Sequence, residues 1–252
     1  MHKHTKAIVR QPGKNFANGI STSALGKPSY ELALKQHNAY CEALQSCGLE
    51  VIVLPADEKF PDGCFVEDTA VVTSEVAIIT KPGDTARVEE VDRIAEVLSK
   101  YKKTETINLP GTLDGGDIMR VGNHFYIGMS KRTNEEGATQ LASILAKYGY
   151  TSSQIPVKSV LHLKTGITCL GNNNFISVEE FANVFKESNV IKLDPDEFYS
   201  ANCLKVNDYL LIPKGFPKSK KQIVELGYNV IEIEMTEFRK MDGGLTCLSL
   251  LF

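Results

Sequence analysis

The feature that most constrains the fold of this chain is a recurring order of short strands and helices. Two β-rich runs joined by a tight turn precede a helical pattern, and a further β-rich run follows. Helix starts recur at intervals of roughly 40–55 residues, the spacing of a repeating supersecondary unit. Five units of about 50 residues account for all 252 residues. The pattern predicts an α/β protein with mixed sheets and internal repetition.

Periodicity places the individual elements. Helical patterns cover 30–46, 86–101 and 134–148, with weaker ones at 178–186 and 218–226. The β-rich runs are 7–9, 51–54, 69–72, 76–80, 118–121, 125–128, 160–163, 174–177, 204–206, 209–212 and 230–233. Turns at 121–124 and 206–209 join neighbouring runs as hairpins. A doubly wound nucleotide-binding sheet lacks such hairpins, and neither phosphate-binding glycine motif occurs, so no cofactor is expected.

Composition excludes several classes of function. Lys and Arg number 28 against 31 Asp and Glu, so no global positive charge attracts nucleic acid. The apolar runs are too short to span a membrane, and the polar start resembles no export signal. The six cysteines lack the spacing of a zinc or dithiol site, so no metal is expected and most thiols should be free and buried. We therefore expect one domain over residues 1–252, in the cytoplasm.

Three segments carry more polar residues than their surroundings justify. In the first, Glu67 and Asp68 open an apolar run. If this run is a strand, the two side chains point to opposite faces, so at least one would be desolvated and need a cation. A solvated strand end is equally compatible with the pattern. The second is Asp114-Gly115-Gly116-Asp117, where glycines permit a close approach of the backbone, or form a plain tight turn. The third is the C-terminal segment 240–252.

The C-terminal segment contains Cys247, and an isolated histidine, His162, lies in the apolar run 160–163. Each alone is more often a buried structural residue. Together with the carboxylates they supply a thiol nucleophile, an acid/base and a negatively charged surround. This combination suits a planar guanidinium, which binds carboxylates bidentately, better than the neutral amide that a papain-like protease attacks.

With these segments in view, the chain resembles the dimethylarginine dimethylaminohydrolases of the guanidine-modifying (pentein) superfamily. The resemblance rests on five stretches in the family's order: Phe65–Val72, Leu113–Asp117, Ser130–Asn134, Leu161–Lys164 and Asp242–Cys247. It implies a five-bladed αβ-propeller of ββαβ modules. It also implies a hydrolase that cleaves Nω-methylated arginine to citrulline and dimethylamine or methylamine through a covalent cysteine intermediate.

The resemblance further implies roles for named residues. Cys247 attacks the guanidinium carbon, His162 acts as acid and then base, and Asp114 orients His162. Binding of the substrate falls to Asp62, Glu67, Asp68, Arg87, Arg132 and Ile20. In this set the carboxylates hold the guanidinium, the arginines hold the α-carboxylate, and Ile20 is the apolar residue of an N-terminal lid loop.

Alternatives remain on the same scaffold and outside it. An arginine deiminase or a citrulline hydrolase would use the same triad on another substrate. A silent guanidine-binding module is a third reading, against which the presence of Cys247, His162 and Asp114 argues. The expected partner is a small guanidino amino acid, and a homodimer is a candidate assembly; neither nucleic acid nor membrane is expected as a partner.

Overall fold

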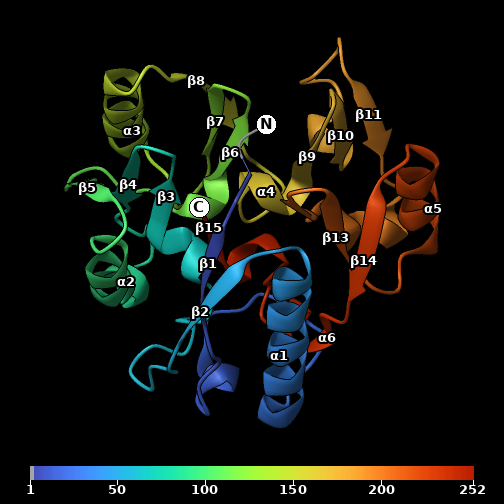
Figure 1. Cartoon of the computed structure of the whole chain (residues 1–252), viewed down its shortest axis with the longest axis horizontal. Helices are drawn as coiled ribbons and strands as arrows, with labels where there is room; N and C mark the ends of the chain where they lie inside the picture. Colours follow the sequence, from blue (N-terminus) through green and yellow to red (C-terminus); the bar gives the residue numbers. More distant parts are fainter. Residues whose placement is uncertain (1–2) are drawn as a thin grey trace.

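The computed structural model describes residues 3–252. Within these residues five three-stranded sheets surround one centre, each with a middle strand that pairs antiparallel with one neighbour and parallel with the other (Figure 1). The predicted repetition is confirmed: the protein is a five-bladed αβ-propeller.

The blades follow the chain, except that the last strand completes the first blade. Their strands are β15(Leu250–Leu251), β1(Lys6–Arg10) and β2(Glu50–Leu54); β3(Ala70–Val72), β4(Val76–Ile79) and β5(Lys103–Thr106); β6(Ile118–Val121), β7(His124–Met129) and β8(Thr151–Pro156); β9(Ile167–Gly171), β10(Asn174–Ser177) and β11(Asn189–Lys192); and β12(Leu204–Val206), β13(Tyr209–Pro213) and β14(Asn229–Ile233). Because β15 pairs with β1, chain segments far apart in sequence close the ring.

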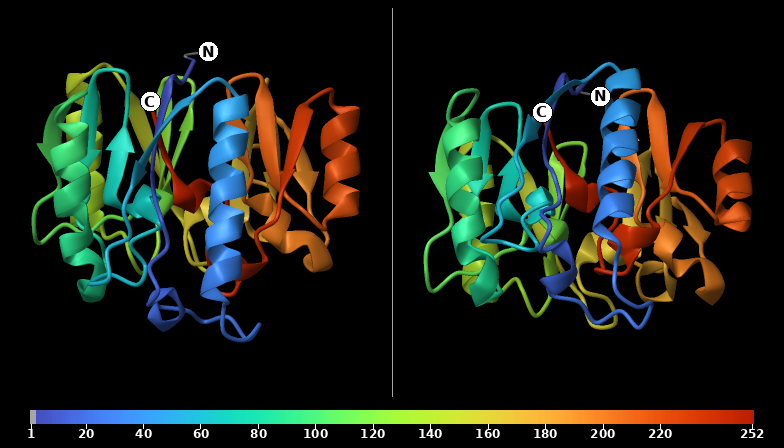
Figure 2. Two further views of the ribbon diagram at one scale, coloured as in Figure 1. Left: turned by 60° about the horizontal axis from the view of Figure 1, so that its bottom comes forward. Right: turned by 90° about the horizontal axis from the view of Figure 1, so that it is seen from below.

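The α-helices are α1(Tyr30–Ser46), α2(Val91–Leu98), α3(Glu135–Lys147), α4(Leu163–Gly166), α5(Pro217–Glu225) and α6(Thr236–Arg239); the 3₁₀ turns are η1(Phe16–Asn18), η2(Val66–Thr69), η3(Thr85–Glu90), η4(Gly115–Asp117), η5(Glu179–Phe181), η6(Pro195–Ala201) and η7(Thr246–Leu248). Helices α1, α2, α3 and α5 each connect the middle strand of a blade to its parallel partner, the turn η5 does so in the fourth blade, and α4 and α6 lie between blades. Helices α1, α2, α3 and α5 form the outer rim beside the strands (Figures 1 and 2). No helix of residues 3–252 is long and apolar enough to cross a bilayer.

Most of the predicted elements are confirmed, with local reasons. The Ser29 side chain accepts a hydrogen bond from Leu32 N at the start of α1, and Gly48 follows its end with φ +88°. The side chain of Asn134 caps α3 in the same way. The predicted hairpin turn at 206–209 contains Asn207 with φ +51°.

Two predictions were wrong. The helix expected over 178–186 is reduced to the 3₁₀ turn η5, and no side chain caps its start at Val178. The strand expected over 160–163 is irregular backbone leading into α4, whose first amide, Leu163 N, donates to Asp117 Oδ1 at 3.0 Å. The pattern 86–101 divides into η3 and α2.

The sequence analysis also missed strands β5, β8, β9, β11 and β15. Strands β5 and β8 are polar and largely exposed, since each is an edge strand with a partner on one side only. They follow no alternation of polar and apolar residues, and their pairing to the apolar middle strands specifies them.

Candidate active site

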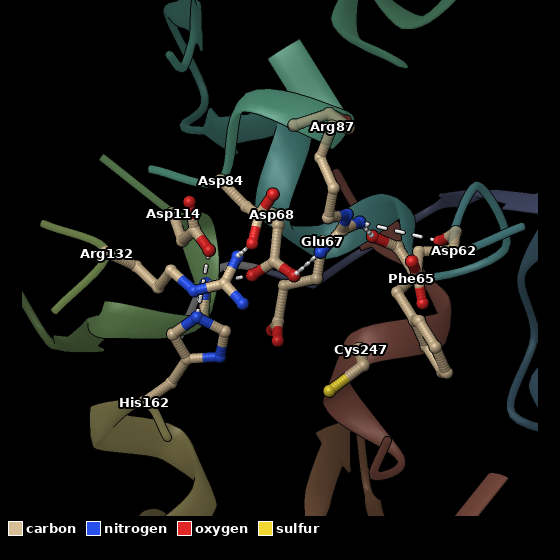
Figure 3. Close-up of polar contacts among 12 residues, drawn as sticks. Asp62, Phe65, Glu67, Asp68, Asp84, Arg87, Asp114, Arg132, His162 and Cys247 are labelled. Carbon is tan, nitrogen blue, oxygen red and sulfur yellow. Dashed lines mark hydrogen bonds and ion pairs between the residues drawn. The ribbon is translucent and has the colours of Figure 1, made fainter. Parts of the chain in front are cut away.

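Short elements from different blades meet at the centre of the molecule. Turn η2 contacts both η4 and η7, and α4 contacts η4. Around them lies a cavity of about 60 Å³. Its lining residues are Ile20, Thr22, Asp62, Phe65, Asp68, Arg87, Arg132, Leu161, His162, Met241, Asp242, Gly243 and Cys247. The fold therefore gathers most of the sequence-predicted site residues into one cavity, shown in part in Figure 3.

Cys247 lies in η7 and is held from both sides. The buried Tyr40 of α1 donates to Leu245 O at 2.9 Å and shares a 2.7 Å hydrogen bond with Ser249 Oγ. Gly244 N lies 3.3 Å from Cys247 Sγ as a donor. Burial, and then the negative charges of nearby carboxylates, raise the pKa of the Cys247 thiol to about 12. The thiol is thus fixed in place and protonated near neutral pH.

His162 lies across the cavity from the sulfur (Figure 3). Its Nε2 is 3.0 Å from Asp114 Oδ2, while Asp114 Oδ1 accepts from Gly83 N at 2.8 Å. Burial lowers the pKa of His162, but the charge of Asp68 and the bond to Asp114 outweigh it and raise this pKa to about 9. The imidazole is therefore cationic at neutral pH and holds a proton to donate.

The Gly115-Gly116 pair serves a close approach as well as a turn. A Cβ on Gly116 would lie 2.8 Å from His162 Nδ1 and 2.9 Å from Asp68 Oδ1. Its amide also donates to Asp68 Oδ1 at 2.9 Å. Only glycine lets the backbone lie against both side chains.

Glu67 and Asp68 lie in η2, not in a strand, and the expectation that they point to opposite strand faces was wrong. Both are buried. Asp68 Oδ2 accepts from Arg87 Nη1 at 2.6 Å; although burial favours its neutral form, His162 and Arg87 lower the pKa of Asp68 to about 2. The predicted need for a counter-cation is confirmed.

Glu67 binds different partners. Its Oε1 accepts from Lys164 Nζ at 2.5 Å, and its Oε2 accepts from Thr246 Oγ1 at 2.7 Å. Burial raises the pKa of Glu67, an effect that Lys164 opposes. Glu67 is thus joined to the turn that carries Cys247.

The two arginines differ in how far their donors are already used. Arg87 is buried, and it binds Asp68, Glu90 Oε2 at 2.8 Å and Phe65 O at 3.0 Å. Arg132 reaches into the cavity (Figure 3) and pairs with Asp84 Oδ2 at 3.1 Å. Arg132 therefore has the greater number of donors available to a ligand.

Asp62 and Ile20 lie where the segment after η1 crosses the cavity. Ile20 N donates to Asp62 Oδ2 at 3.0 Å, and Ile20 is 38% exposed. Burial raises the pKa of Asp62, an effect that this bond opposes. The same segment is bound to the other end of the chain, since Thr22 N donates to Asp242 Oδ2 at 2.5 Å.

Sequence reasoning missed the residues that support these groups: Asp84, Glu90, Lys164, Asn202 and Thr246. Lys164 and Thr246 lie within two of the stretches that carry the resemblance, Leu161–Lys164 and Asp242–Cys247, so their position in the sequence was a usable signal. Asp84, Glu90 and Asn202 lie in unremarkable contexts, and only folding brings them to the site.

A further cluster could be considered for a metal ion. One ligand atom each of Asp68, Asp114 and His162 lies within 4.8 Å of the others. Asp114 already binds His162, and Asp68 already binds Arg87, so two adjacent cations, the Arg87 guanidinium and the His162 imidazolium, neutralise the carboxylates. The hydrogen bonds and ion pairs among these side chains thus account for their arrangement, and we do not assign them to a metal site.

Comparison with known proteins agrees with this geometry. The family model described as N,N dimethylarginine dimethylhydrolase, eukaryotic, matches residues 16–248. A curated N(G),N(G)-dimethylarginine dimethylaminohydrolase from Pseudomonas aeruginosa is 46% identical over all of both chains. A solved structure of the enzyme from Pseudomonas aeruginosa, in which a cysteine is replaced by serine and citrulline is bound, is also similar. It superposes on this chain with a TM-score of 0.98, at 45% identity and over the full length of both chains.

A more distant structure shares the fold alone. The N-terminal domain of the cyanobacterial arginine dihydrolase ArgZ superposes with a TM-score of 0.87 at 17% identity, over 99% of this chain and 97% of that one. The fold is therefore common to enzymes with different activities. On the full-length match at 46% identity and the family model together, this chain belongs to the dimethylarginine dimethylaminohydrolase family.

Proposed function

We propose that this protein hydrolyses Nω-methylated arginines to citrulline and dimethylamine or methylamine. The observation that carries the proposal is the full-length likeness to dimethylarginine dimethylaminohydrolases, together with a cavity that places Cys247 opposite the bonded pair of His162 and Asp114. A buried thiol beside carboxylates is a poor nucleophile until a cation binds, and a guanidinium is such a cation.

The reaction proceeds in two steps. When the guanidinium binds, the Cys247 thiol releases its proton to solvent. Cys247 Sγ then bonds to the guanidinium carbon, the bond from this carbon to the methylated nitrogen breaks, and the leaving amine takes a proton from His162. His162 then accepts one proton from water, and the water oxygen bonds to the thiouronium carbon. The carbon–sulfur bond breaks, the second water proton goes to the Cys247 sulfur, and citrulline is released. Asp114 keeps the imidazole oriented throughout.

The remaining site residues bind the substrate. Glu67 and Asp68 provide the negative charge for the guanidinium, and Asp62 adds a carboxylate beside the lid. Arg132 binds the α-carboxylate with the donors that Asp84 does not use, and Arg87 contributes its remaining donor. Ile20 covers the bound substrate.

A product assay tests the proposal. Dimethylarginine, monomethylarginine, arginine and citrulline are offered in parallel to wild type and to Cys247→Ser, with products measured by mass spectrometry. Citrulline with a methylated amine from wild type alone is expected. Turnover of arginine or citrulline alone would instead assign a deiminase or a citrulline hydrolase, and no turnover of any of the four would leave a binding module.

Location and assembly belong to the same proposal. We propose that the protein is a single domain located in the cytoplasm, a reducing compartment in which thiols such as its six free cysteines persist. A homodimer remains a prediction, which sedimentation of the purified protein tests.

A further inference from the structure

We propose that Lys164 is a positioning residue for Cys247: its ammonium group binds Glu67, and this ion pair both holds the turn that carries the cysteine and balances the carboxylate charge facing the thiol. The inference rests on the proposed function in taking Cys247 as the nucleophile. It adds a residue that touches neither the substrate cavity nor the reacting atoms.

The first link is a chain of three charged or polar groups. Lys164 Nζ lies 2.5 Å from Glu67 Oε1, and Thr246 Oγ1 lies 2.7 Å from Glu67 Oε2. The side chains of Lys164 and Glu67 are only 18% and 10% exposed. Thr246 directly precedes Cys247. A largely desolvated ion pair thus acts on the nucleophile through one peptide unit.

A second link runs through the backbone of Lys164. Asn202 Nδ2 donates to Lys164 O at 2.9 Å and lies 3.1 Å from Thr246 Oγ1, and Asn202 Oδ1 accepts from Thr246 N at 2.9 Å. The side chain of Lys164, through Glu67, and its carbonyl, through Asn202, therefore both connect to Thr246. Together these hydrogen bonds hold Thr246 by its amide and by its hydroxyl.

The charge balance around the thiol gives Lys164 a second effect. The titratable groups that act most directly on Cys247 are Glu67 and Asp68 of η2, Lys164 of α4, Tyr40 of α1 and Tyr199 of η6. The charged or titratable residues that share the cavity with Cys247 are Asp62, Arg87, Arg132, His162 and Asp242. Burial raises the thiol pKa most, the two carboxylates raise it further, and Lys164 lowers it. Lys164 is the nearby cation that opposes Glu67, since Arg87 binds Asp68 and not Glu67.

This balance predicts opposite effects from the two partners. Lys164→Met leaves Glu67 without its cation and should move the thiol titration to higher pH, whereas Glu67→Gln removes the negative charge and should move it to lower pH. The double variant should fall between the two. Lys164→Arg keeps the charge and should stay close to wild type.

The test follows alkylation of Cys247 by iodoacetamide against pH, read on the Cys247 peptide by mass spectrometry. At a fixed pH below the midpoint, each unit of upward shift slows labelling about tenfold. We expect the labelling of Cys247 to be about tenfold slower in Lys164→Met. In the double variant, which also carries Glu67→Gln, the labelling rate should return toward that of wild type. Lys218→Met, which removes an exposed lysine paired with Asp194, is the control and should label like wild type.

The readout does not depend on turnover, so it separates this inference from the proposed function. Equal labelling profiles for Lys164→Met and wild type, or shifts of the same sign in Lys164→Met and Glu67→Gln, would overturn the inference while leaving the reaction intact. If Lys164→Met does not fold, Glu67→Gln, the double variant and Lys164→Arg are compared instead. This comparison still decides, because only a charge effect moves the Cys247 titration of the double variant to a higher pH than that of Glu67→Gln.

Discussion

The Nε2 atom of His162 and the Oδ2 atom of Asp114 lie 3.0 Å apart, and Asp114 is fully buried. The carboxylate fixes the ring orientation and stabilises its positive charge, because burial of Asp114 shields this hydrogen bond from solvent. The other Asp114 oxygen is held by Gly83 N. Each group of the catalytic pair is thus fixed by a partner from another part of the chain.

Asp114→Asn should therefore lower kcat by about two to four orders of magnitude, because the amide supports the imidazolium poorly and can select the wrong tautomer. KM should change little. Steady-state kinetics with dimethylarginine measure both. Asp194→Asn, on the surface, serves as the control, and a kcat for Asp114→Asn within threefold of wild type would remove Asp114 from the mechanism.

The thiol of wild-type Cys247 should be slow to alkylate near pH 7, because burial and two carboxylates raise its pKa to about 12. Its labelling rate should rise throughout the pH range in which the protein stays folded. Iodoacetamide labelling of the free enzyme, read on the Cys247 peptide, checks this. Fast labelling that does not vary with pH would show a thiolate already formed before substrate binds.

Gly116→Ala should impair both folding and activity. The new Cβ would meet the His162 ring and Asp68 Oδ1 at less than 3.0 Å, so both must move, at a cost of about 1–3 kcal/mol. Thermal melting and kcat report the two effects. In Gly149→Asn the new Cβ has no atom within 4 Å and asparagine tolerates φ +79°, so this control should melt near wild type.

Asp242 should hold the segment that contains Ile20 and Thr22 closed over the cavity. Its Oδ2 accepts from Thr22 N at 2.5 Å and Thr22 Oγ1 at 2.9 Å, and its φ of +57° suits glycine. Asp242→Gly removes these bonds without straining the backbone, so we expect KM to rise about fivefold for about 1 kcal/mol. The melting temperature is the control. An unchanged KM would show that the segment stays closed without Asp242.

The charge of His162 should stabilise the fold at low and neutral pH. Burial lowers its pKa, but the charge of Asp68 and the bond to Asp114 raise it to about 9, so the contribution is complete below the unfolded value near 6.5 and is lost as pH rises through 9. The free energy of unfolding of wild type and of His162→Gln is measured by urea titration at pH 6 and at pH 9.5. Between the lower and the higher pH, wild type should lose about 3 kcal/mol of this free energy relative to His162→Gln. A constant difference would contradict a raised pKa.

Sequence periodicity determined the repeating plan of the fold, because apolar middle strands and amphipathic helices such as α1 carry their pattern locally. It could not determine edge strands such as β5, whose polar residues pair on one side only. Sequence reasoning also singled out Cys247, His162 and Asp114, but each alone is more often a structural residue, and the resemblance to the family assigned their roles.

Tertiary structure alone decided how these residues act. Asp114 and His162 are 48 positions apart, and Lys164 and Glu67 are 97 apart, so no local pattern records either pair. Closure of the ring by β15 brings η7 to the centre, where burial and the surrounding charges set the pKa values of Cys247, His162 and Asp68. The sequence supplies the reactive groups; their ionisation depends on desolvation and on distances that exist only after folding.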